Sequence, residues 1–202
     1  MIKFINFIII YFLCLIKCFC NNIIQIQIFS ETSEIYNNIS LPYINSIYKQ
    51  NILWIHNILF KNNNNLVLYK NNNIIIIKDN VFFNNNFYIL ALPYIQLKTI
   101  RDLRNHHLPL LYEMKNKIIN IAKLYNISRN QLYIYFHYHP SYYYLHLHGC
   151  IITHPLLDSR YLRNYFIDDV IENLKINNYY YKYKTLKFEL KSNNQLFNLL
   201  MN

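Results

Sequence analysis

Residues 144–148 read Tyr144-Leu145-His146-Leu147-His148, and aromatic or polar side chains alternate there with leucines. A period of two is typical of a β-strand, in which every second side chain points to the same face. The two histidines then lie on one side of a strand, about 6.5–7 Å apart along the backbone. Histidine is the side chain best suited to nucleophilic or acid–base chemistry near neutral pH, so this stretch indicates a reactive pair presented by a sheet.

The pair belongs to a denser group, because four of the eight histidines fall within twelve positions: His137, His139, His146 and His148. His137 lies on the preceding predicted strand and can face the same pocket. From the residues alone, three interpretations stay open: a catalytic histidine pair, a structural cluster in a tyrosine-rich sheet, and a zinc site. The zinc site is disfavoured, since no cysteine or carboxylate neighbours accompany these histidines.

Outward from this stretch, the sequence predicts an α+β fold with an antiparallel sheet flanked by two main helices. Alternation predicts strands over 131–138 and 143–152, and Leu186, Phe188 and Leu190 face inward on a last strand. The strand candidates 66–69 and 74–77 form a plausible hairpin, and a buried strand over 87–92 ends at Pro93. Helical spacing follows Thr99 and Asp102, which have the form of a capping box. The two main helices are expected after an Asn105 cap, with Pro109 in the first turns, and over Leu162, Phe166, Val170 and Leu174.

The N-terminal part has a different composition. Residues 1–20 form a nearly unbroken apolar stretch after Lys3, as in a signal or anchor segment, and hold three of the four cysteines. Residues 21–50 suggest a strand and then a polar connector, the remnant of an N-terminal domain or a linker. The body is expected to be residues 51–202, and Cys150 to be a small buried apolar residue there.

The net positive charge of the chain indicates which class of binding partner it favours. The chain has 202 residues, 20 basic and 10 acidic, and a formal charge of +10, which favours anionic partners such as nucleic acid or phosphorylated molecules. Charged residues make up only 15% of the chain and hydrophobic residues 53%, which excludes disorder driven by charge.

Residues 139–148, His-Pro-Ser-Tyr-Tyr-Tyr-Leu-His-Leu-His, resemble the motif of the histidine-triad (HIT) superfamily, and more narrowly the C-terminal domain of scavenger mRNA-decapping enzymes. Two further stretches match in order, Ile100–Leu103 with His107–Leu111, and Val170–Leu174. The resemblance covers about residues 87–200, is weak over 51–86 and does not extend to 1–40. It implies a HIT-like fold, a homodimer, work in cytoplasm or nucleus, and cleavage of m7GpppN to m7GMP and a nucleoside diphosphate through a phosphohistidine, without metal or cofactor.

The resemblance also implies roles for individual residues. His146 matches the nucleophile, and His148 the histidine that holds and polarises the phosphate. The expected partners are a capped mononucleotide or a short capped oligonucleotide, with no stable nucleic-acid complex, and a membrane only if residues 1–20 are a real anchor. The residues that match contacts to the phosphates and the cap are Trp54, Asp79, Tyr88, His137, Ser141, Tyr142 and Arg163.

Four departures accompany the resemblance. Tyr144 stands where the first histidine of the triad is expected, which predicts weaker catalysis with the nucleophile retained. The run Asn62–Asn65 offers no acid to recognise guanine, and Val81 replaces a pocket lysine. Most of the N-terminal domain is missing. These departures keep two alternatives open: a general hydrolase of dinucleoside polyphosphates, and a catalytically weak protein that binds caps or nucleotides.

Overall fold

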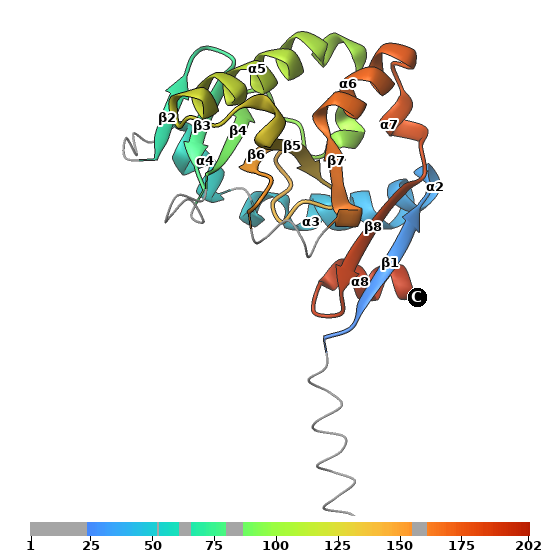
Figure 1. Ribbon diagram of the computed structural model, residues 1–202. Coiled ribbons are helices and arrows are strands. Elements are labelled where there is room, and N and C mark those ends of the chain that lie inside the picture. The colour runs from blue at the N-terminus through green and yellow to red at the C-terminus, as the bar shows by residue number, and fades with distance from the viewer. Residues whose placement is uncertain (1–23, 52, 61–65, 80–86, 155–160) are drawn as a thin grey trace, which may run out of the picture. The chain divides into compact units, whose positions relative to one another are not determined.

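The computed structural model describes residues 24–51, 53–60, 66–79, 87–154 and 161–202 (Figure 1). The described residues divide into two compact units: residues between 29 and 189 form the larger, and residues 24–28 with 190–202 belong to the smaller. In the smaller unit, the backbone of Gln25 bonds to Ser192, and helix α8 begins at the cap Asn194. The candidate site residues all belong to the larger unit.

The secondary structure confirms the predicted α+β class. The strands are β1 (Ile26–Glu31), β2 (Val67–Lys70), β3 (Ile74–Lys78), β4 (Tyr88–Pro93), β5 (Leu132–His137), β6 (Leu147–Ile151), β7 (Asn164–Phe166) and β8 (Leu186–Lys191). The helices are α2 (Ser33–Ile35), α3 (Leu41–Asn51), α4 (Leu53–Phe60), α5 (Leu108–Leu124), α6 (Ile167–Ile176), α7 (Tyr180–Tyr183) and α8 (Gln195–Met201), with a π-turn at Tyr36–Ser40 and 3₁₀ turns at Ile100–Asp102, Asn105–His107, Arg129–Gln131 and Tyr161–Arg163.

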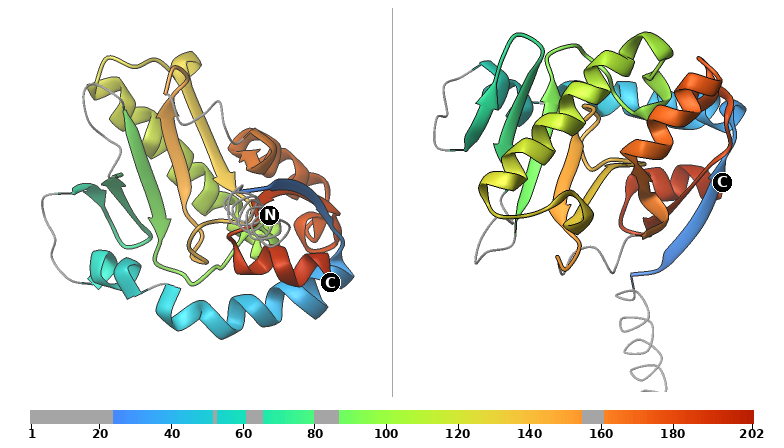
Figure 2. Two further views of the ribbon diagram at one scale, coloured as in Figure 1. Left: turned by 90° about the horizontal axis from the view of Figure 1, so that it is seen from below. Right: turned by 45° about the horizontal axis from the view of Figure 1, so that its top comes forward.

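One antiparallel sheet of six strands, in the order β2-β3-β4-β6-β5-β7, forms the centre of the larger unit (Figure 2). Every residue of β4 is buried, as expected for a central strand covered on both faces. The predicted hairpin is confirmed as β2–β3. The side chain of Asn71 accepts hydrogen bonds from the backbone N–H groups of Asn73 and Ile74 and so fixes the turn.

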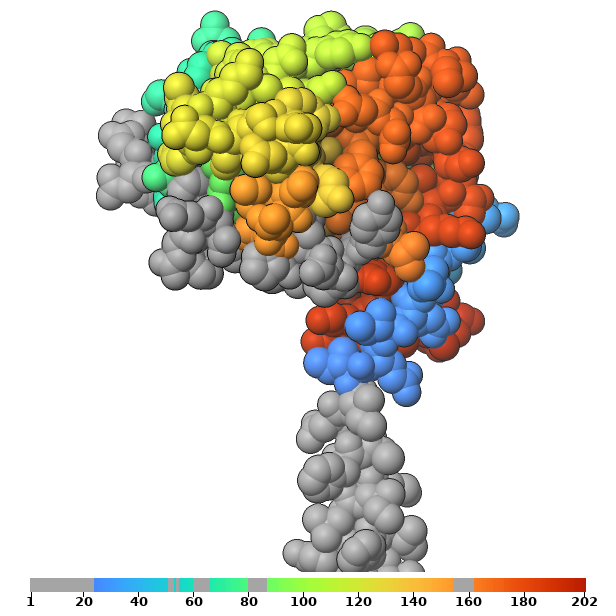
Figure 3. All heavy atoms as spheres, viewed as in Figure 1, coloured from blue at the N-terminus to red at the C-terminus, as the bar shows by residue number. Residues whose placement is uncertain are grey.

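The two faces of the sheet have different coverings. Helix α5 packs on β4 and β6, and α6 packs on β5 and beside α7. Figure 3 shows the residues of α5 (light green to yellow) and those of α6 and α7 (orange) on the surface of the molecule. On this face Gly149 of β6 lies directly under Ile118 of α5. On the opposite face Tyr88, Tyr135 and Cys150 pack with Ile55 and Leu59 of α4. His148 alternates with Gly149, so the histidines of the site share the second face.

The two long helices start later in the chain than predicted. Helix α5 begins at Leu108 with His107 as its N-cap, so the predicted cap Asn105 is wrong and instead opens a 3₁₀ turn. Pro109 lies in the first turn as expected, and the Thr99–Asp102 capping box is present on the short turn Ile100–Asp102. The last strand is also confirmed, with Leu186, Phe188 and Leu190 buried.

Helix α6 begins at Ile167, whereas the prediction extended it back to Leu162. Leu162 is exposed, and Phe166 ends the edge strand β7. The residues from Asn164 to Phe166 pair with β5, and this backbone pairing overrides their apolar helical spacing.

The strand that carries the histidines is shorter than predicted. It runs over 147–151 rather than 143–152, because the preceding backbone groups have other partners. The Leu145 N–H donates to the Leu97 carbonyl, and the Tyr144 carbonyl accepts from the His146 ring. Both groups are therefore unavailable to a sheet ladder.

Residues 33–51 are helical, so the predicted polar connector is wrong over that range. Helix α3 and the turn before it pack Tyr36 and Ile44 against Tyr143. The signal-like stretch 1–20 lies outside the described residues. Over the described ranges, none of the helices combines the length and apolarity needed to span a bilayer.

Candidate active site

Three histidines form a row at one end of the sheet face that carries Tyr88 and Tyr135. His148 lies on β6, His146 immediately precedes this strand, and His137 ends β5. The ring centroids of His146 and His148 are 4.7 Å apart, and those of His148 and His137 are 4.3 Å apart. The structure thus brings together the three histidines that the strand pattern placed on one face.

His146 is held in one tautomer by the main chain. Its Nδ1 lies 2.6 Å from the Tyr144 carbonyl oxygen, which can only accept a hydrogen bond, so Nδ1 carries the proton. The unshared electron pair is then on Nε2. The pKa of His146 is lowered below its ordinary value of 6.5. Burial is the main cause, and the charge of Arg163 acts in the same direction. The ring is neutral at physiological pH and presents a nucleophilic nitrogen.

Tyr144 supplies the orienting group for His146 through its backbone. Its side chain points elsewhere, because the phenol is 1% exposed and its hydroxyl donates to the Pro93 carbonyl at 2.6 Å. Burial raises the pKa of Tyr144, so this hydroxyl stays protonated. The exchange of histidine for tyrosine at this position therefore leaves the hydrogen bond to His146 in place.

His148 is fixed by two tyrosines. The Tyr88 hydroxyl lies 2.8 Å from Nδ1 of His148 and 3.0 Å from the Tyr135 hydroxyl. The Tyr135 ring stacks on the imidazole with an interplanar angle of 7° and a centroid distance of 5.2 Å. An imidazole nitrogen is a better acceptor than a phenol oxygen, so Tyr88 donates to Nδ1, and Nε2 of His148 becomes a hydrogen-bond donor.

The predicted phosphate-binding residues lie on two neighbouring segments. Arg163 precedes β7, and one of its terminal nitrogens donates to the His139 carbonyl at 2.6 Å. Ser141 and Tyr142 follow His139 and are exposed, Tyr142 to 40%. Arg163 is close enough to His146 to lower the pKa of its imidazole, so a positive charge accompanies the proposed nucleophile.

The cap-pocket residues are placed less completely. Asp79 follows β3, its N–H donates to the Tyr88 carbonyl, and its charge raises the pKa of His146 against the larger effect of burial. Trp54 lies on α4, and its side chain is outside the described residues. The residues Asn62–Asn65 and Val81 are outside them as well. Tyr88, predicted as a cap contact, has its hydroxyl on His148.

Within the part of the chain that the structure describes, no group of three or more His, Cys, Asp or Glu side chains is arranged to hold a metal ion. Cys150 is fully buried, and burial raises the pKa of its thiol to about 12, as expected for a small apolar residue.

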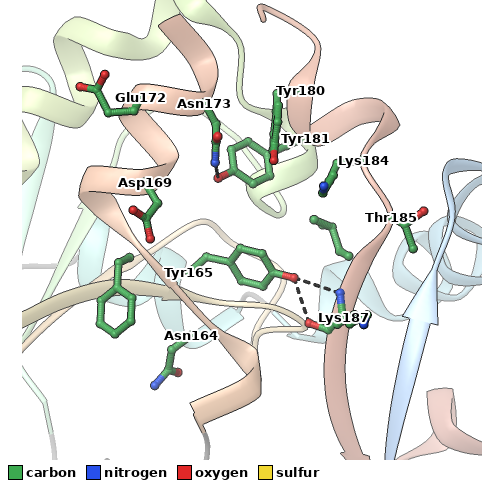
Figure 4. Close-up of a pocket in the computed structure, with 12 residues that line it drawn as sticks. Asn164, Tyr165, Asp169, Glu172, Asn173, Tyr180, Tyr181, Lys184, Thr185 and Lys187 are labelled. Carbon is green, nitrogen blue, oxygen red and sulfur yellow. Dashed lines mark hydrogen bonds between the residues drawn. The ribbon is translucent and has the colours of Figure 1, made fainter. Parts of the chain in front are cut away.

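A cavity of about 690 Å³ lies away from the histidines, between β7, α6, α7 and β8 (Figure 4). Tyr165 lies across it, and its hydroxyl bonds to the Lys187 backbone. None of the predicted site residues lines this cavity, and its mixed lining, with Asp169 opposite Lys184, does not select one class of ligand.

Sequence reasoning missed Tyr135 and a buried ion pair that contacts Tyr138 and His139. Tyr135 was recognisable, because it shares the predicted strand face with His137. The ion pair joins Arg101 to Glu31, seventy positions away in the chain, and no local pattern indicates such a contact.

Comparisons with known proteins identify the relatives of this chain. Residues 53–160 match the family model described as "Scavenger mRNA decapping enzyme C-term binding". The chain is 32% identical over 178 residues to an m7GpppX diphosphatase of Caenorhabditis elegans, covering 82% of this chain and 56% of that protein. It is 30% identical over 186 residues to the human m7GpppX diphosphatase, covering 87% of this chain and 55% of that protein.

Among solved structures, the chain is similar to one described as "Hnt3 in complex with DNA and guanosine", with a TM-score of 0.45 and 15% identity, over 60% of this chain and 75% of that one. The chain spans little more than half the length of the curated relatives named above. The family match covers more than half of this chain and includes the row of histidines, so the chain belongs to the scavenger mRNA-decapping enzyme family.

Proposed function

We propose that this chain hydrolyses the triphosphate of residual capped nucleotides, converting m7GpppN to m7GMP and a nucleoside diphosphate in mRNA cap turnover. The observation that carries the proposal is the 2.6 Å hydrogen bond from Nδ1 of His146 to the Tyr144 carbonyl. It leaves Nε2 with the electron pair that a nucleophile needs, on a ring that burial keeps neutral.

In the first step, Nε2 of His146 attacks the phosphorus next to 7-methylguanosine. The N–P bond forms as the bond from this phosphorus to the bridging oxygen breaks, and the nucleoside diphosphate leaves with that oxygen. The imidazole becomes a phosphoimidazolium cation. The Tyr144 carbonyl then faces a positively charged N–H, and this charge-assisted hydrogen bond stabilises the intermediate.

In the second step, water attacks the same phosphorus, the N–P bond breaks and m7GMP leaves. The water gives up a proton, and His146 regains its electron pair on Nε2. We assign the developing negative charge to the Nε2 donor of His148 and to Arg163, because preorganised donors are most effective where charge develops. His137, Ser141 and Tyr142 are proposed to bind the remaining phosphate oxygens.

For the cap itself, we propose that Trp54 stacks on 7-methylguanine, since a cationic ring favours the face of tryptophan. Asp79 and Tyr88 are assigned to this pocket as its carboxylate and its phenol. Recognition of the methylated base depends on fewer matched residues than the phosphate chemistry does. The test therefore needs substrates that distinguish recognition of the methylated base from cleavage of the triphosphate.

Turnover of m7GpppG, GpppG and ApppA, with and without a metal chelator, tests the proposal. We expect cleavage of m7GpppG to m7GMP and GDP in the presence of chelator. Equal rates on m7GpppG and ApppA would favour a general dinucleoside polyphosphate hydrolase. Binding of m7GMP without turnover and without a trapped phosphohistidine would favour a binding protein. Absence of both turnover and binding by folded protein would refute an active site of this family.

His146→Asn is the decisive variant. An amide nitrogen has no available electron pair, so turnover should fall by at least about 10³-fold. His106→Asn is the matched control, since His106 is an exposed histidine outside the row. Tyr144→Phe keeps the carbonyl that orients His146 and removes only the hydroxyl bound to Pro93, so turnover should persist.

Two further assignments are proposals from the family alone. A homodimer is one, and the exposed apolar side chains of Leu53 and Ile95 would suit its interface. Light scattering of the purified chain tests it. Work in the cytoplasm or nucleus is the other, and fractionation of cells that express the chain, with sequencing of its mature N-terminus, tests that.

A further inference from the structure

We propose that Glu31, from a segment that precedes the residues matched by the family model, is a positioning residue for Arg163. The inference rests on the proposed function for its meaning in catalysis. Its physical basis is a buried carboxylate that connects the N-terminal segment to the residues between His137 and Ser141.

The Glu31 carboxylate is saturated with donors. Ser40 and His139 donate to Oε1, and Arg101 and Tyr138 donate to Oε2, the Arg101 contact being 2.8 Å. Glu31 is 1% exposed, and each of its donors is at most 3% exposed. The pKa of Glu31 falls to about 2, because the bonds to His139, Arg101 and Ser40 outweigh the effect of burial. The group is an anion that accepts only, so His139 must donate from Nε2.

Two of these donors, Tyr138 and His139, are consecutive and follow the last residue of β5. The same two residues hold Arg163. The Tyr138 N–H donates to the Arg163 carbonyl at 2.8 Å, and the Arg163 guanidinium donates to the His139 carbonyl at 2.6 Å. The position of Arg163 therefore depends on where residues 138 and 139 lie.

The Glu31 carboxylate also fixes the orientation of the His139 ring, through its hydrogen bond from Nε2. With Nε2 on Glu31, Nδ1 of His139 faces the Tyr143 hydroxyl at 3.4 Å. Tyr143 packs on Tyr36 and Ile44 of the N-terminal helical segment. The loop 138–146 is thus tied to the segment 31–44 at Tyr138 and His139 and again at Tyr143, and Glu31 makes the only charged contact among these ties that the described residues show.

Arg101 explains why an apolar residue cannot replace Glu31. Its guanidinium is 2% exposed and also donates to the Tyr181 and Lys184 carbonyls. Removal of the carboxylate leaves a buried cation without its anion, which is strongly destabilising. Glu31→Gln also removes the charge, but it keeps the shape of the side chain and an oxygen that can accept a hydrogen bond from Arg101, so it is the mildest variant that tests the carboxylate.

The test is a double-mutant cycle of Glu31→Gln and Arg163→Gln, measured on kcat/KM for m7GpppG and on the Kd for m7GDP. Because misplacement of a catalytic group by about 1 Å costs about 10²-fold, we expect Glu31→Gln alone to lower kcat/KM by about 10–100-fold. In the Arg163→Gln background the same change should cost less than about 3-fold, since the group that it positions is gone.

Met114→Ala is the control for lost stability. Met114 is a fully buried residue of α5 outside the site, so this variant should lower the unfolding midpoint and leave kcat/KM within about 2-fold well below that midpoint. If Glu31→Gln does not fold, Tyr138→Phe removes one donor from the carboxylate and should show the same coupling to Arg163→Gln at smaller size.

Equal losses in both backgrounds, or full kcat/KM in folded Glu31→Gln, would overturn the inference. A wild-type chain that binds m7GDP without turning over m7GpppG would remove the proposed function, and the cycle on Kd would still decide the role of Glu31. A folded wild-type chain that neither binds m7GDP nor turns over m7GpppG would refute both the proposed function and the role of Glu31.

Discussion

Gly149, the lone glycine of the chain, is predicted to tolerate no β-carbon. A Cβ built at this position lies 2.5 Å from Cγ2 of Ile118, and 3.4 Å from Cδ1 of Ile118 and Cγ1 of Ile89. Its φ angle is not positive, so the backbone itself would accept alanine. Ile118 is fully buried on α5, and its branched side chain has one strongly preferred rotamer in a helix. The methyl group at Cγ2 cannot turn away, and the strand and helix must separate.

The magnitude follows from two opposing effects. Overpacking of this kind costs about 1–3 kcal/mol, whereas replacing a strand glycine by alanine returns about 0.5–1 kcal/mol of backbone entropy. Gly149→Ala should therefore lower the free energy of unfolding by about 1–2 kcal/mol. Urea denaturation monitored by circular dichroism measures this change, which should move the midpoint with an unchanged slope.

Two backgrounds separate the contact from other causes. Ile118→Ala removes Cγ2, so Gly149→Ala should cost nothing there, although Ile118→Ala itself costs about 2–5 kcal/mol. Ile118→Val keeps Cγ2 and removes only Cδ1, so the cost of Gly149→Ala should remain. The reasoning is refuted if Gly149→Ala is neutral in the wild-type background, or if it costs the same with Ile118→Ala as with Ile118→Val.

The remaining predictions concern the histidines. Protonation of His146 removes its electron pair, and burial lowers its pKa, so kcat/KM should fall as the pH drops, with a midpoint below 6.5; a midpoint above 6.5 would contradict the assignment. Tyr88→Phe removes the donor to Nδ1 of His148, so the neutral ring should populate both tautomers, and kcat should fall about 10-fold. Nitrogen-15 chemical shifts of His148 report the tautomer. A change confined to KM, with the tautomer unchanged, would instead indicate that Tyr88 contacts only the cap.

The sequence predicts the elements of the fold better than their ends. The central strands and the body of α5 follow directly from apolar spacing. The predicted starts of β6 and α6 are wrong because distant partners decide them: the Leu97 carbonyl for Leu145, and the pairing of β5 for Asn164. A window of neighbouring residues contains none of these contacts.

In the site, too, local spacing predicts some features and distant contacts decide the others. The spacing of His146 and His148 predicts that both side chains share a face, and the structure adds which nitrogen of each ring carries the proton. The contribution of Glu31 was not predictable, because its partners Arg101 and Tyr138 are 70 and 107 positions away. Residues that meet only through the tertiary fold leave no periodic trace in the chain.

The hydrogen bond between His146 and the Tyr144 carbonyl bears on how such enzymes are recognised. A peptide oxygen is common to all twenty amino acids, so the identity of the side chain at this position carries no information about whether the neighbouring ring is activated. What limits substitution there is the buried volume and an acceptor at the end of β4. A motif written as three obligatory imidazoles would overlook chains whose first member contributes only its backbone.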